Sequence, residues 1–435
     1  MPELGKGRGE NVAELLVFGF GTSVAMWFAG YLGRLPGVSV PSVLLGVALL
    51  ACLVAGGFAA GRFGSRGASG AVKAGLVTGA INLLVLGSLL SDSDPGRVKV
   101  AAVLWIPGSF LATALLTGAG GLAGATGRIT ASKARNWPWW FAVVTAAATM
   151  LLLVVGGVVT SQKAGLAVVD WPNSFGYNMF LFPVSRMTGG VYYEHAHRLF
   201  GSLVGLTTVT LAVVVHLCDR RRWLRFFSLT AVGAVIVQGI LGGLRVTGTF
   251  TLATDASRTT PNIVLAVVHG VFGQVFFGMV VAIAVFLSAT YGSEAEPARQ
   301  RAATTDQALS ATLTAVLLVQ LILGAQQRHL DRGLLIHVSL ATIVVMLALA
   351  TGARAASLHK DVAALRSTGI VLSVLISLQA VLGISAMAAI GVEPGPSGPA
   401  AWQVLLRAAH QGTGALLLAS AVVLTIWSRR LLTAE

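Results

Sequence analysis

Repeated apolar runs of about 20 residues limit the possible folds of this chain more than any other feature. A run of this length crosses a ~30 Å hydrocarbon layer as an α-helix. Spanning segments fold as helices because lipid offers no partners for backbone polar groups. Of the 435 residues, 55% are hydrophobic and only 11% are charged. We therefore predict an all-α integral membrane protein with about twelve transmembrane helices. These cover approximately residues 12–32, 40–61, 71–90, 98–120, 139–160, 194–218, 226–246, 262–290, 307–326, 333–351, 367–388 and 402–427.

The net charge of +14 is explained better by the membrane than by a nucleic-acid partner. With both termini cytoplasmic, most of the 30 Lys and Arg residues fall in inner loops, as the positive-inside rule requires. We expect a bacterial plasma membrane location, with lipid around the protein and no nucleic acid bound. The two cysteines, Cys52 and Cys218, lie in different predicted helices and indicate neither a disulfide framework nor a metal site.

The chain divides into three predicted parts, and the last two form a repeat. Residues 1–132 contain four helices, no histidine and no evident chemistry. His197 and His337 are 140 residues apart, and His269 and His410 are 141 apart. The sequence Q-x-x-L-G also recurs, at 238–242, 320–324 and 379–383. We predict a duplicated four-helix bundle, over residues 136–292 and 304–430, in one orientation.

The four repeated histidines all lie near predicted outer helix ends, and a small residue follows each of them one turn later. These small residues are Gly201, Gly273, Ala341 and Gly414. A lone histidine in a helix more often packs than binds a ligand, but four at matched depth reverse this expectation. Two histidines from neighbouring helices of a bundle suit haem iron, and each small residue would leave room for a flat group. Zinc or copper would need more ligands close together.

Charged groups accompany only the first of these histidines. Glu194, His197 and Arg198 share one helix face at the start of a predicted helix, whereas His195 points away from it. Ionisable groups at membrane depth indicate function. The repeat places Leu334 where the first half has Glu194, and only the first half has a long outer loop, 161–193. The asymmetry predicts one reacting half and one electron-relay half.

Two further sets of polar residues leave alternatives open. Four arginines near outer helix ends could pair with haem propionates or extend to the membrane surface. They are Arg198, Arg245, Arg328 and Arg407. The glutamines of Q-x-x-L-G could contact haem, although hydrogen bonding between helices is the favoured interpretation.

Over about residues 136–430 the sequence resembles the haem A synthase family, membrane enzymes that oxidise a methyl group of haem O to the formyl group of haem A. The resemblance rests on E-H-A-H-R at 194–198, T-S-Q-K-A-G-L-A-V-V-D-W-P at 160–172 and Q-G-I-L-G-G-L-R-V-T at 238–247. His269, His337 and His410 complete the pattern. The chain departs from the family in lacking the cysteine pair that some bacterial members carry in the first outer loop. Its four N-terminal helices also lie outside the family's eight-helix core.

The resemblance implies roles for the site residues. Haem O would bind between His197 and His269, with Glu194 as the carboxylate needed for turnover and Arg198 as a cofactor-binding residue. A haem b would bind between His337 and His410, so that all four histidines ligate haem iron. The implied partners are a haem O-producing membrane enzyme and an electron acceptor, and an oligomer is compatible with this arrangement.

Two other functions account for part of the pattern. A non-catalytic di-haem electron-transfer protein would explain the four histidines but leaves Glu194 and the long loop unexplained. A transporter would suit the repeat and the small residues. It gives no reason for paired histidines at one depth.

Overall fold

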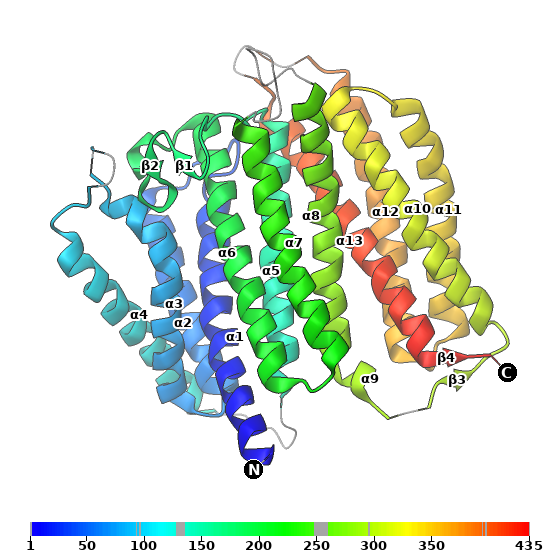
Figure 1. Ribbon diagram of the computed structural model, residues 1–435, viewed down its shortest axis with the longest axis horizontal. Coiled ribbons are helices and arrows are strands. Elements are labelled where there is room, and N and C mark those ends of the chain that lie inside the picture. The colour runs from blue at the N-terminus through cyan, green and yellow to red at the C-terminus, as the bar shows by residue number, and fades with distance from the viewer. Residues whose placement is uncertain are drawn as a thin grey trace. The chain divides into compact units, whose positions relative to one another are not determined.

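The computed structural model describes residues 2–92, 94, 97–127, 135–247, 260–294, 296–393, 395 and 398–434. Among these residues, twelve helices are long and apolar enough to cross a membrane (Figure 1). This confirms the predicted all-α integral membrane fold. The only strands within the described ranges are two-residue segments outside the long helices.

The long helices follow one another along the chain, and the longest segment between two of them, residues 162–188, precedes α6. They are α1 (Pro2–Leu32), α2 (Ser42–Phe63), α3 (Gly67–Leu90), α4 (Ala102–Ala125), α5 (Trp137–Ser161), α6 (Gly189–Cys218), α7 (Arg222–Thr247), α8 (Thr260–Leu287), α10 (Ala303–Leu330), α11 (Leu334–Leu358), α12 (Ala363–Ile390) and α13 (Ala401–Leu431). A short α9 (Ala289–Gly292) follows α8. The loop before α6 holds the hairpin β1 (Asn173–Ser174) and β2 (Tyr177–Asn178) and two 3-10 turns, η1 (Met179–Leu181) and η2 (Val184–Arg186). The parallel strands β3 (Ala298–Arg299) and β4 (Leu432–Thr433) pair beside the C-terminal end of α13.

Helix α6 begins earlier than its apolar run predicts. It starts at Gly189, so Glu194 lies inside the helix and not at its first residue. The helix includes five residues before Glu194, among them Tyr192, whose ring stacks on Tyr31. Helical residues therefore lie on both sides of Glu194 along the chain.

Two compact units make up the chain. Unit 1 consists of Met1–Leu152 and Ala167–Val232, and unit 2 consists of Leu153–Leu166 and Gly233–Glu435. The division into parts 1–132, 136–292 and 304–430 stays a prediction, and its boundary at residue 132 lies outside the described residues.

Close glycine contacts organise the N-terminal helices of unit 1. Gly57 and Gly61 of α2 face the backbone of α4, where added Cβ atoms would overlap the carbonyl oxygens of Thr117 and Gly121. Small residues let helix backbones approach closely in lipid, where dispersion contacts replace the hydrophobic effect. These glycines therefore allow α2 and α4 to pack closely.

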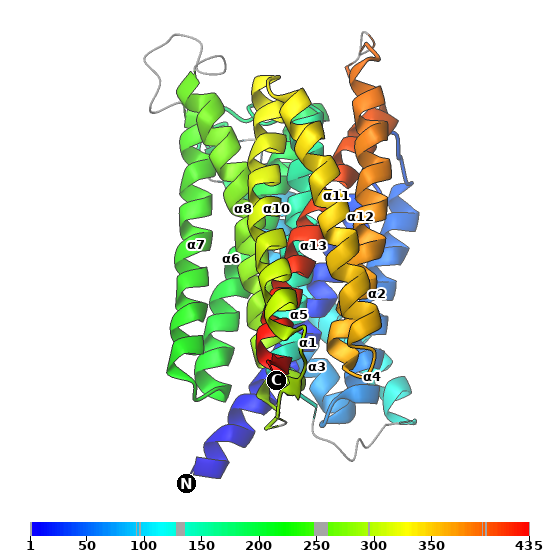
Figure 2. The ribbon, with the colours of Figure 1, turned by 90° about the vertical axis from the view of Figure 1, so that its right-hand side faces the viewer.

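In unit 2, helices α10 to α13 form a four-helix bundle (Figure 2). Helix α10 packs on α11 and α13, and α12 packs on the same two helices. Its core includes Leu313, Leu372 and Leu417, each at most 2% exposed. Helices α11 and α13, which carry His337 and His410, are therefore both held between the same two neighbours.

Candidate functional site

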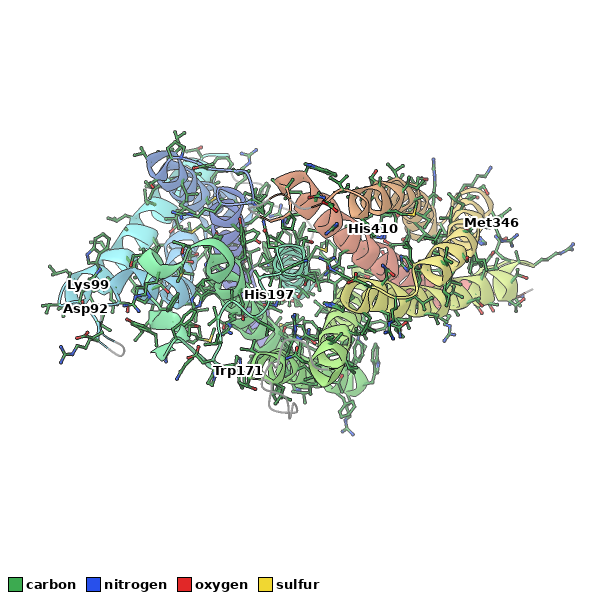
Figure 3. All side chains as sticks on the ribbon, turned by 90° about the horizontal axis from the view of Figure 1, so that it is seen from above. Asp92, Lys99, Trp171, His197, Met346 and His410 are labelled. Atoms are coloured by element: carbon green, nitrogen blue, oxygen red, sulfur yellow. The ribbon has the colours of Figure 1, made fainter. Side chains whose placement is uncertain are left out.

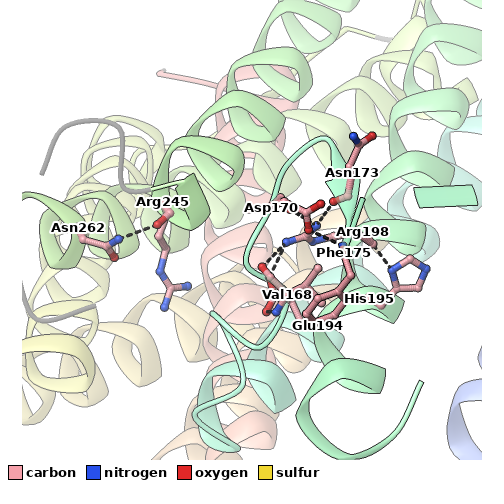
Figure 4. A network of polar contacts seen from close by, with 10 residues as sticks. Val168, Asp170, Asn173, Phe175, Glu194, His195, Arg198, Arg245 and Asn262 are labelled. Atoms are coloured by element: carbon pink, nitrogen blue, oxygen red, sulfur yellow. Dashed lines mark hydrogen bonds and ion pairs between the residues drawn. The ribbon is translucent and has the colours of Figure 1, made fainter. Parts of the chain in front are cut away.

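A buried ion pair on α6 forms the polar centre of unit 1. The Arg198 guanidinium donates from Nη2 to Glu194 Oε1 over 2.8 Å, and the two side chains are only 9% and 5% exposed. The second carboxylate oxygen, Glu194 Oε2, accepts a hydrogen bond from the backbone N–H of Val168 over 2.9 Å. Both oxygens of Glu194 are thus oriented, one by the helix and one by the outer loop (Figure 4).

Arg198 also binds the backbone of the outer loop. Its Nη1 donates to the carbonyl oxygens of Asp170 and Asn173, at 2.7 and 2.8 Å, and its Nη2 donates to that of Val168 at 2.9 Å. A guanidinium suits this role because its donors have a fixed planar geometry. In unit 1 these contacts make Arg198 the residue that fixes the loop to Glu194. Its predicted role as a haem-binding residue stays a prediction.

The outer loop has its own internal order. The Asp170 carboxylate accepts hydrogen bonds from the backbone N–H groups of Phe175 and Gly176, at 2.6 and 2.8 Å. Phe175 and Gly176 have φ values of 52° and 78° and form the turn between β1 and β2. Left-handed conformations are costly for a residue such as Phe175, and the Asp170 side chain holds this turn in place.

His195 points into the folded loop. It is fully buried, its Nδ1 lies 3.2 Å from Ser174 Oγ, and its ring centre is 5.0 Å from that of Phe182. These contacts differ from those of Glu194, the residue before it, as the helical geometry predicts. His195 therefore connects α6 to the loop in unit 1.

The face of α6 near His197 has room for a flat group. His197 lies one turn after Glu194, and an added Cβ at Gly201 or Gly205 would meet no described atom within 4 Å. A histidine beside two successive glycines of this kind fits an axial ligand with a porphyrin along the helix. Figure 3 labels His197 on α6.

In unit 2, each of His269, His337 and His410 packs against a glycine of the preceding helix. The histidine Cε1 atoms lie 3.1, 3.0 and 3.1 Å from where a Cβ would stand on Gly242, Gly324 and Gly383, respectively. These are the last residues of the three Q-x-x-L-G sequences. A Cβ at any of these glycines would make a tight contact with the imidazole ring, so the ring would have to shift by a few tenths of an ångström.

The glutamines of the same sequences hold the histidine-bearing helices. Gln238 Nε2 donates to the backbone oxygen of His269 over 2.9 Å, and Gln320 Nε2 donates to that of His337 over 3.0 Å. Gln379 Nε2 lies 3.5 Å from His410 Nε2. The favoured interpretation of these glutamines, hydrogen bonding between helices, is what the structure shows for Gln238 and Gln320.

The small residue after the histidine has a different role in unit 2 than expected. A Cβ on Gly273 would lie 3.0 Å from Gln238 Nε2, and one on Gly414 would lie 3.3 Å from Gln379 Nε2. These glycines make room for the glutamine amide, so the expected space for a flat group is wrong at both positions. We use the name Gln-Gly socket for the glutamine and the last glycine of each Q-x-x-L-G sequence together with the histidine that they contact. The three sockets hold His269, His337 and His410.

Two of the candidate propionate-binding arginines, Arg328 and Arg407, donate to backbone carbonyls of unit 2. Arg328 Nη2 donates to Gly157 O and Ser161 Oγ, at 2.8 and 2.7 Å, and Arg407 Nη2 donates to Ala389 O at 3.2 Å. The guanidinium nitrogens of Arg245 lie 2.9 and 3.0 Å from where a Cβ would stand on Gly165. These arginines hold helix ends and the start of the outer loop.

The residues of the second bundle fit a haem. Histidines on α11 and α13 form the donor set typical of bis-histidine haem. The buried Nδ1 of His410 makes no hydrogen bond to any described residue. Its ring is placed by Gly383 and Gln379, and the ring of His337 by Gly324 and Gln320, so both histidines are held before a ligand binds.

Residues 139–338 match the family model described as cytochrome oxidase assembly protein, COX15-CtaA. This part of the chain is similar to that family. The match includes Glu194, His197, Arg198 and His269 and ends just after His337. A comparison with curated proteins found no match.

Members of this family are in general oxidoreductases of haem A synthesis, and they serve the assembly of cytochrome oxidase. The chain is an integral membrane protein, with twelve candidate membrane-spanning helices among the described residues. Helices α1 to α4 and His410 lie outside the matched residues.

The contacts of the outer loop with Arg198 could not be found from the sequence, since backbone acceptors leave no pattern there. The Gln-Gly sockets did leave a signal, because glutamine, glycine and histidine recur together.

Proposed function

We propose that the protein oxidises the methyl group of haem O to the formyl group of haem A. The observation that carries this proposal is the buried Glu194–Arg198 pair, one turn from His197 on the face that Gly201 and Gly205 leave open. A carboxylate fixed in a poorly solvated place stabilises positive charge or receives a proton with little reorganisation. No such group accompanies the second histidine pair at the corresponding position, Leu334.

In this proposal, His197 and His269 orient the substrate haem O and bring its methyl group near Glu194. Conversion of a methyl to a formyl group with oxygen from water removes four electrons and releases four protons. Glu194 would take up protons at its carboxylate, and Arg198 would keep that carboxylate in place. The four electrons must pass to an acceptor, and His337 and His410 would hold the haem that supplies one-electron redox chemistry.

We also propose that a haem b occupies the second bundle, with His337 and His410 as its iron ligands. When bound, this haem supplies one-electron redox chemistry. The protein's own part is to hold both imidazoles with the Gln-Gly sockets and to exclude water with the apolar core of the bundle. Both termini would be cytoplasmic in a bacterial membrane, and haem O would come from another membrane enzyme.

Haem extraction from purified full-length protein tests the proposed reaction. The chain is expressed with a source of haem O, and the extracted haems are separated. We expect haem A and haem b from the wild type, and haem O with haem b from Glu194→Gln. Glu393→Gln, which changes an exposed carboxylate between α12 and α13, is the matched control and should retain haem A.

Two results would contradict the proposal. Normal haem A formation by Glu194→Gln would remove Glu194 from the reaction. Extraction of haem b alone from the wild type, with haem O supplied, would favour the non-catalytic di-haem electron-transfer protein.

A further inference from the structure

Two of the four N-terminal helices, α1 and α3, contact α6 and the outer loop before it. Tyr31 of α1 stacks on Tyr192 of α6, with ring centres 6.3 Å apart and an interplanar angle of 14°. Tyr31 and Trp27 also meet Phe200 edge to face, at 5.8 and 5.5 Å. All these residues belong to unit 1. Tyr192 and Phe200 flank the segment from Glu194 to Arg198 along α6, so α1 contacts this helix on both sides of it.

The aromatic residues of α1 are themselves held by α3. Trp27 Nε1 donates to Asn82 Oδ1 over 3.0 Å, and Asn82 Nδ2 lies 3.4 Å from the sulfur of Met26. Trp27, Tyr31 and Phe200 are at most 8% exposed. Buried aromatic pairs of this geometry stabilise beyond the area they bury. Asn82, a polar residue in an apolar helix, thereby has a structural role.

Helix α3 also touches the outer loop directly. A Cβ on Gly87 would overlap the carbonyl oxygen of Phe180, and the next residue, Ser88, has its Oγ 3.5 Å from that oxygen. Phe180 belongs to η1, two residues before Phe182, which packs on His195. A continuous set of contacts therefore runs from α3 through the loop to the residue beside Glu194.

We propose that helices α1 and α3 form a positioning scaffold that fixes the outer loop and the outer end of α6. The scaffold residues are Trp27 and Tyr31, which contact α6, and Gly87, which contacts η1. They act on Glu194 through two paths: the helix that carries it, and the loop whose Val168 N–H binds its carboxylate. The consequence for turnover rests on the proposed function, but the mechanical part does not. The part of the chain that the family model matches begins at residue 139, after both helices.

Two full-length variants test the scaffold, each with a matched control. Gly87→Ala places a methyl group against the Phe180 carbonyl, whereas Gly46→Ala on α2 meets no described atom within 4 Å. Trp27→Leu removes the buried contact with Phe200, whereas Trp105→Leu changes a tryptophan of α4 that is 59% exposed. If Gly87→Ala fails to fold, Ser88→Ala is used in its place, because it removes only the hydroxyl group beside Phe180.

The first readout is independent of activity. We expect faster amide hydrogen exchange in residues 173–186 and 189–200 of Gly87→Ala and Trp27→Leu, with unchanged exchange in α11 to α13. Trypsin should cleave more rapidly after the exposed Arg186. Neither change should occur in the controls. Exchange and cleavage equal to those of the controls would overturn the scaffold.

The second readout separates positioning from mere stability. The amount of haem O retained should stay as in the wild type, while conversion per retained haem O falls about tenfold, because small displacements of a reacting group are costly. Loosened exchange with unchanged conversion would overturn the positioning role. A wild type that makes no haem A would refute the proposed function instead, and hydrogen exchange would then decide on the scaffold alone.

Discussion

His197 and His337 hold the same place in the repeat but lie in different surroundings. His337 follows a tight turn, in which Asp331 and Gly333 have φ values of 50° and 92°, and its ring packs on Gly324 with Gln320 bound to its backbone. His197 follows a long ordered loop, and the glycine after it opens on free space. Under the proposed function, His337 would hold a haem that stays bound, and His197 would hold a haem that is converted and released.

The charged residues follow the same division. Glu194 and Arg198 are one turn apart on α6, whereas the corresponding positions of α11 are Leu334 and Val338. Burying an ion pair costs desolvation energy that apolar residues would avoid. A pair kept in only one of two similar halves therefore indicates a role in chemistry more than in stability.

Replacing Glu194 by leucine, the residue at the corresponding position of the second half, should have the largest effect on haem A formation. Glu194→Leu copies Leu334 and leaves Arg198 without its carboxylate partner. We expect haem A formation to fall by at least about 10²-fold, because a preorganised charge is lost from the reacting site. Leu334→Glu should not create a second reacting site, since α11 has neither the loop nor an arginine at position 338. The ratio of haem A to haem O in extracts of both variants measures this, and substantial haem A from Glu194→Leu would contradict it.

Adding a side chain to the glycine of a Gln-Gly socket should have an intermediate effect, on the haem b content. Gly324→Ala places a methyl group 3.0 Å from Cε1 of His337, so the ring must shift. We expect the haem b content to fall severalfold, as measured by haem absorbance per protein. Gly239→Ala on α7 meets no described atom within 4 Å and is the control. Equal haem b in the two variants would show that the socket does not position the ligand.

Removing a glutamine should have the smallest effect. Gln320→Leu deletes the hydrogen bond to the backbone oxygen of His337, which is worth about 1 kcal/mol between helices in a membrane. We expect a slightly lower unfolding temperature and slightly weaker haem b retention, with haem O retention unchanged. A loss of haem O in this variant would instead place Gln320 in the substrate site.

The sequence predicts the framework of this protein well, because membrane crossing imposes a strong pattern. Apolar length locates all twelve spans of the described residues, and the repeat of His197 and His337 finds the matched positions. The start of α6 is less accurate, because residues 189–193 continue the helix ahead of the ionisable cluster at which the predicted span begins.

What the sequence could not provide depends on contacts between distant segments. The glycines after His269 and His410 look like space for a ligand, yet glutamine side chains from other helices occupy that space. Arg198 looks like a free cation near a helix end, but it binds backbone carbonyls that have no sequence signature. Similarly, nothing in residues 1–132 suggests chemistry until Tyr31 is seen against Tyr192.

We propose that the two histidine pairs hold different haems, one that is oxidised and one that is retained. Haem extraction from His197→Ala and His337→Ala, each expressed with a haem O source, tests it directly. The account predicts that His197→Ala retains haem b and loses haem O and haem A, whereas His337→Ala loses haem b and retains haem O. Loss of the same haem from both variants would contradict it.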